Sequence, residues 1–110
     1  MSLDPFAIDA VLAMHADADP RAPGGEVTVA LCGHWEHDGP CRWPHNSRFE
    51  TDTDAAHLRT VVVAAGDEHE EIVRKVEGAL RADSRWVVLR FATGPIAGDE
   101  RDLAARLERS

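Results

Sequence analysis

Cysteine and histidine side chains gather in one short stretch of this sequence. Both cysteines and four of the six histidines lie between Cys32 and His57. Thiolate and imidazole groups are the ligands that zinc favours in proteins, usually four of them in a tetrahedron. We therefore predict a metal site, with zinc as the expected ion, whose ligands are Cys32, His34, Cys41 and His45.

The spacing of these residues suggests how they could meet. Cys32 and His34 are two positions apart, so on a β-strand both side chains would project from the same face. The turn signal Asp38-Gly39-Pro40 would then fold Cys41 and His45 back over that face. Four protein ligands close the coordination shell, which favours a structural metal over a catalytic one. The order of ligands is not the zinc-finger signature, which begins with two closely spaced cysteines.

The same segment allows other chemistry. An open metal position beside Glu36 or Asp38 would hold a reactive water. A disulfide between Cys32 and Cys41 is a further option, which a reducing compartment disfavours. A small enzyme or a protein that binds an anionic ligand would use a pocket of five side chains, His34, His37, Cys41, Trp43 and Arg48. The remaining alternative is a dimerising domain with no site.

Several side chains near the turn are suited to contact a partner protein or a ligand. Trp43 lies in a loop between Arg42 and Pro44, where large aromatic residues often serve as contact anchors. Arg48 and His37 are predicted to complete this contact surface. We therefore expect an accessory or interaction domain, stabilised by metal, in preference to an enzyme.

Composition narrows the classes of function. The net charge is −8, and Lys75 is the only lysine beside 11 arginines. Binding to nucleic acid or to an anionic membrane surface requires a positive surface, so neither is expected. The first residues show no signal peptide, and no run approaches the roughly 20 apolar residues of a membrane span. A cytoplasmic protein with one domain over residues 1–110 is the expectation.

Hydrophobic periodicity predicts the elements that would position the site. We predict an amphipathic helix over 5–17, a loop over 19–25 and a strand from Glu26 to Glu36. A polar strand over 48–53 and a buried strand over 58–65 follow. A helix then begins with a capping box of Asp67 and Glu70 and ends near Ala82. A strand over 85–92 and a terminal helix that Asp99 caps complete the order.

These elements predict an α+β fold with a mixed four-stranded sheet. An N-terminal helix precedes a β-hairpin, a β-α-β unit and a C-terminal helix, and the helices lie mainly on one face. Strands 58–65 and 86–92 are expected to be parallel, because a helix joins them. Val61 and Val63 would leave an apolar opposite face, from which we expect a homodimer.

Overall fold

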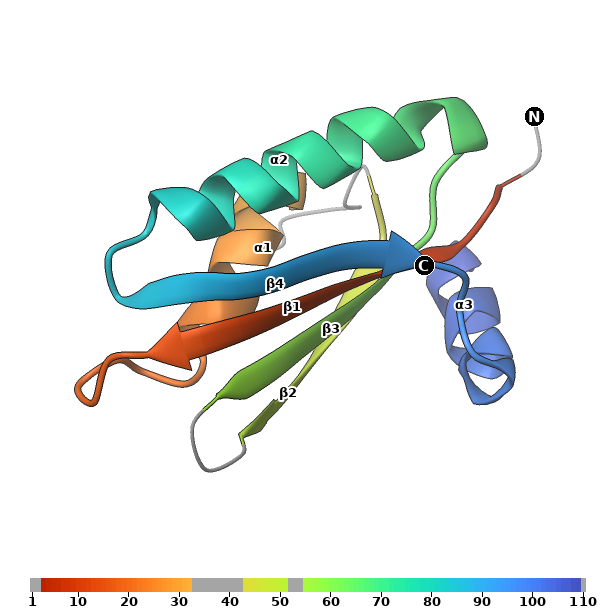
Figure 1. Cartoon of the computed structure of the whole chain (residues 1–110). Coiled ribbons are helices and arrows are strands. Elements are labelled where there is room, and N and C mark those ends of the chain that lie inside the picture. The colour runs from red at the N-terminus through yellow and green to blue at the C-terminus, as the bar shows by residue number, and fades with distance from the viewer. Residues whose placement is uncertain (1–2, 33–42, 52–54, 110) are drawn as a thin grey trace.

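A four-stranded antiparallel sheet is the centre of the computed structural model, which describes residues 3–32, 43–51 and 55–109. Its strand order is β2-β3-β1-β4. Helices α1 and α2 cover one face of the sheet, whereas α3 lies at the end where β4 finishes (Figure 1). In chain order the elements are β1 (Phe6–Met14), α1 (Ala22–Cys32), β2 (His45–Thr51), β3 (Ala56–Val62), α2 (His69–Ala82), β4 (Trp86–Gly94) and α3 (Arg101–Glu108).

The first element is a central strand, so the predicted helix over 5–17 is wrong. Phe6, Ile8 and Leu12 alternate toward the core on one face of β1, while Ala7 on the other face is also buried. The i, i+3, i+4 spacing that suggested a helix is what a strand with two apolar faces also produces. Asp4 does not cap a helix, since its backbone N–H donates to the carbonyl oxygen of Ala64 at 2.8 Å.

Helix α1 replaces the predicted loop over 19–25 and the predicted strand from Glu26. Pro23 occupies its first turn, where a missing N–H costs nothing. Pro23, Val27 and Leu31 follow at intervals of four and are all buried, so they form one helical stripe. The apolar residues that suggested an alternating strand pattern are therefore also spaced as one face of a helix. Two glycines in the first turn made a helix appear unfavourable here.

The second half of the chain follows the prediction more closely. Strands β3 and β4 and helices α2 and α3 form where the sequence predicts them, and α2 ends at Ala82. The capping box of Asp67 and Glu70 is wrong, because α2 begins after a short 3-10 turn and no side chain caps it. Among the residues described, no helix has the length and apolar character needed to cross a bilayer.

The sheet is antiparallel and not mixed, because β1 lies between β3 and β4. Strand β1 is antiparallel to each of them, so β3 and β4 run in the same direction without pairing. This is the split β-α-β arrangement, in which the crossover passes over an inserted strand. The order β-α-β-β-α-β thus produces two edge strands, β2 and β4.

Helix α3 is anchored to the sheet face that α1 and α2 leave uncovered. Asp9 and Arg59 are paired neighbours on β1 and β3 and point away from the core. The Arg59 guanidinium donates to Glu100 Oε1 and Oε2 at 2.7 and 2.8 Å and to Asp9 Oδ2 at 2.7 Å. Glu100 directly precedes α3, and its carboxylate is only 8% exposed. Val61 on this face is 2% exposed, so the chain itself covers the valine that suggested a dimer.

We expect Glu100→Gln to lower stability in a manner that depends on pH. Hydrogen bonds from Arg59 lower the pKa of Glu100 from 4.5 to about 2. Because the folded pKa is the lower one, the charged carboxylate stabilises the protein above about pH 4.5, and this contribution is lost as the pH falls toward 2. Urea unfolding at pH 7 should show a loss on the order of 2 kcal/mol.

The difference in unfolding free energy between the wild type and Glu100→Gln should be smaller at pH 3 than at pH 7. Glu108→Gln, a change of an exposed carboxylate at the end of α3, is the matched control and should leave stability within about 0.5 kcal/mol. Equal losses for Glu100→Gln at pH 7 and pH 3 would contradict a charge-dependent anchor.

Candidate functional site

The predicted metal ligands are distributed over two elements and one stretch that lies outside the described residues. Cys32 is the last residue of α1 and His45 is the first residue of β2. His34 and Cys41, together with His37 and Arg42 of the predicted contact surface, lie outside the described residues. The placement of Cys32 and His34 on one strand is wrong, since α1 is a helix. Zinc bound by Cys32, His34, Cys41 and His45 stays a prediction, which metal analysis of the purified full chain would test.

The structure also shows the surroundings of His45 and of two other predicted site residues, Trp43 and Arg48. One ring nitrogen of His45, Nε2, lies 3.2 Å from Thr28 Oγ1, and Nδ1 lies 3.1 Å from the carbonyl oxygen of Trp43. The Trp43 side chain is 3% exposed and belongs to the hydrophobic core. Arg48 is exposed on β2 and pairs with Glu50 at 3.5 Å. Within the described residues, no three His, Cys, Asp or Glu side chains are grouped closely enough to hold a metal ion.

A polar pocket of about 570 Å³ lies between α1 and β2. Thr28 and His45 meet there, and Ser47 Oγ is 2.9 Å from the hydroxyl of Thr60. The Thr28 hydroxyl also lies 3.1 Å from the carbonyl oxygen of Gly24, to which it donates. Of these hydrogen bonds, the one between Thr28 and His45 joins α1 to the edge strand β2, whereas the Ser47–Thr60 bond joins β2 to β3.

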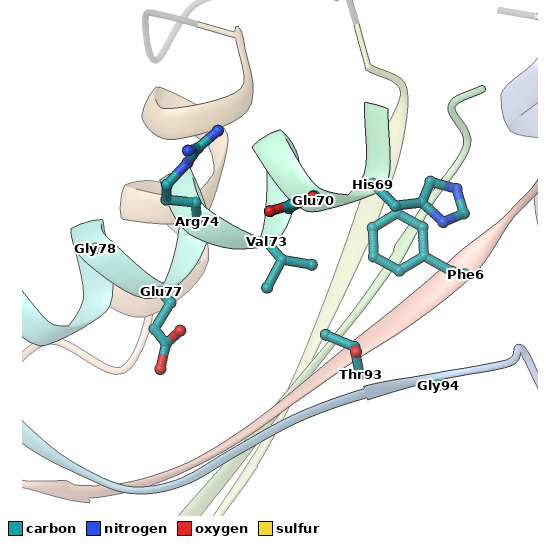
Figure 2. A pocket seen from close by; sticks show the side chains of 9 residues that line it. All are labelled: Phe6, His69, Glu70, Val73, Arg74, Glu77, Gly78, Thr93 and Gly94. Carbon is teal, nitrogen blue, oxygen red and sulfur yellow. The ribbon is translucent and has the colours of Figure 1, made fainter. Parts of the chain in front are cut away.

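A larger and mainly apolar groove of about 720 Å³ lies between α2 and β4, and we call it the α2–β4 groove. Figure 2 shows the side chains that line it: Phe6, His69, Glu70, Val73, Arg74, Glu77, Gly78, Thr93 and Gly94. Its volume falls in the range of about 300–1,000 Å³ that is typical of ligand pockets. The sequence did not predict this groove, because its walls come from three separate elements.

One end of the α2–β4 groove is closed by a pair of stacked rings. The centroids of Phe6 and His69 are 4.0 Å apart, with 28° between the ring planes (Figure 2). His69 Nε2 lies 2.7 Å from the carbonyl oxygen of Asp4 and must donate, since a carbonyl oxygen only accepts. The ring is therefore held from two sides, and this end of the groove is a rigid wall.

The helical wall of the groove carries one small residue in an unusual place. Gly78 lies in the interior of α2, where glycine destabilises a helix by roughly 1 kcal/mol relative to alanine. In the described part of the chain, a Cβ at Gly78 or at Gly94 would meet no atom within 4 Å, and neither backbone requires a positive φ. The internal packing of the protein thus gives no reason for glycine at either position. Both residues instead widen the α2–β4 groove.

The opposite wall is an edge strand with unpaired backbone groups. In the part of the chain that the structure describes, β4 pairs only with β1. A β-bulge at Leu89 interrupts this pairing, and the stretch Arg90–Gly94 beyond it is regular. The other edge, β2, is polar and carries Arg48 and Glu50 as exposed charges. Charged edges resist pairing with foreign strands, so β4 is the more receptive of the two.

No family model matches this chain, and no curated protein is significantly similar to it.

We expect Gly78→Ala to stabilise the protein by about 0.5–1 kcal/mol. The added methyl group meets open space, so the gain in helix propensity is not offset by a clash. Thermal and urea unfolding should show a higher midpoint for Gly78→Ala than for the wild type. A loss of stability would show that the glycine has a structural role within the fold.

Proposed function

We propose that this protein is a binding module that takes an extended peptide segment of a partner protein as an added strand on β4. The observation that carries the proposal is the unpaired edge Arg90–Gly94 directly beside the α2–β4 groove. Addition of a strand to a sheet edge is a recurring mode of peptide recognition. The backbone of the edge supplies affinity, and a neighbouring groove selects side chains.

The geometry of β4 implies which side chains of the peptide would be selected. Thr93 of β4 pairs with Ile8 and lies on the helix side of the sheet, in the groove lining. An added strand continues the alternation of the sheet, so every second side chain of the peptide would enter the α2–β4 groove. Phe6 and Val73 make that space apolar. The preferred peptide therefore has apolar residues at alternate positions.

The open side of the groove favours a peptide over a small molecule. Small-molecule sites combine an enclosed apolar space with a few convergent polar groups. Here the charged side chains Glu70 and Arg74 are exposed at the rim, and Glu77 forms an ion pair with Arg81 at 2.9 Å. Binding of a chain that follows the edge fits this open arrangement better than binding of a small molecule.

Selection of peptides from a random heptapeptide display library on the purified full chain would test the proposal. We expect enriched sequences with apolar residues at alternate positions. A synthetic peptide of such a sequence should bind, and N-methylation of alternate amides should weaken its binding at least tenfold, because methylation removes hydrogen bonds to β4.

Gly78→Leu should fill the groove and weaken binding of the same peptide at least tenfold. Gly98→Leu is the matched control, because a side chain at Gly98 also meets open space but lies outside the groove. Peptides that bind Gly78→Leu as tightly as the wild type, or a library without enrichment, would refute the proposal.

A further inference from the structure

The described residues cover one sheet face only in part, and this face is distinct from the α2–β4 groove. Helices α1 and α2 lie on the other face, and α3 lies at one end of the sheet (Figure 1). Near that end, Ala7 and Val61 are fully buried on the open face. Toward the opposite end, the register places Val11, Ala13 and Val87 on the open face, and the exposed bulge residue Leu89 lies next to them in β4. We call these four residues the open-face patch.

The β-bulge in β4 makes this patch larger than simple alternation would. Val11 pairs with Arg90 and Leu12 pairs with Val88, so Leu89 is the extra residue. Val88 and Phe91 pack against the core, whereas Val87 and Leu89 are 55% and 57% exposed. Large apolar side chains with this exposure on one face mark a surface that binds another molecule.

The charges on the open face are balanced, although the chain as a whole is not. The chain carries a net charge of −8, so most of its surface would repel a second copy. Among the described residues of β1–β4 that point to this face, together with the Glu100 that binds it, arginines and carboxylates are equal in number: Arg48, Arg59 and Arg90 against Asp9, Glu50 and Glu100. This face is therefore one on which two copies can meet without net repulsion.

The sheet register also makes the charges self-complementary. Glu50 pairs with His57, His57 with Val11, and Val11 with Arg90, so these four residues form one row across the sheet. Glu50 stands on one edge strand and Arg90 on the other. A two-fold axis parallel to the strands would place each Arg90 opposite the partner's Glu50, with the open-face patch between them.

From these observations we infer that two copies of this chain associate through the open face, with the open-face patch at the centre and Arg90 opposite Glu50 across the interface. The uncovered area is about four strands wide at about 4.8 Å and about six residues long at about 3.4 Å, or roughly 400 Å² in projection. Specific interfaces bury about 800 Å² on each partner, so the dimer is a weak one that forms at micromolar concentration or above.

Sedimentation velocity across a concentration series of the full chain, from about 1 µM to 1 mM, would test this inference. We expect a concentration-dependent shift from monomer to dimer. Arg90→Glu and Glu50→Arg should each raise the dissociation constant at least tenfold by opposing like charges. The double variant should recover most of this loss, because the exchanged charges are complementary again.

Leu89→Ser should abolish the dimer, while Leu3→Ser, a change of another exposed leucine outside the open face, should leave it intact. Circular dichroism should show that every variant remains folded. A chain that stays monomeric at 1 mM would overturn the inference. So would a dimer that ignores Arg90, Glu50 and Leu89, which would indicate association at the β4 edge instead.

Discussion

The position of β1 between β3 and β4 is the constraint on which the rest of the structure depends. Strand β1 pairs on both edges and is largely buried on both faces, so it has contact with every layer of the molecule. On one face, Ile8 and Leu12 support α1 and α2 through the core. On the other, Asp9 binds the Arg59 side chain that anchors the segment before α3. A strand that is buried on both faces must be largely apolar at both odd and even positions, and apart from Asp9 the sequence of β1 is apolar throughout.

The two surfaces to which we assign binding partners both include part of β4, on either side of its bulge. The regular stretch after the bulge offers its edge and the adjoining α2–β4 groove. The residues up to and including the bulge offer Val87 and Leu89 on the open face. An added peptide would bind at the edge and a second copy on the face, so the two proposed surfaces point in different directions, although Arg90 belongs to both. A dimer would therefore present two peptide sites.

The sequence predicted the correct element where the apolar residues fit only one periodicity. It was misleading where their spacing fitted both a helix and a strand. In α2, Ile72, Val76 and Leu80 are buried between charged residues, which only a helix explains. In β1, the same apolar residues satisfy both a helical and a strand pattern, and Asp4-Pro5 added a false helix start. In α1, Gly24 and Gly25 suggested a loop because glycine has a low helix propensity. The burial of Val27 and Leu31 against the core outweighs this low propensity, so the segment is a helix. The α2–β4 groove arises from the approach of distant segments, and Gly78 inside a helix was its only local sign.

The pairing of β1 also shapes how the chain folds. Ala10 is opposite Leu58 and Phe91, which follow it by 48 and 81 positions. Closing such long loops costs conformational entropy before any contact repays it, so chains dominated by distant pairings fold slowly. Strand β1 is synthesised before β4, and one of its two edges stays unpaired until β4 has been synthesised. Until β4 arrives, an apolar strand edge stays open to the wrong neighbours, and that interval is when this protein is most prone to aggregate.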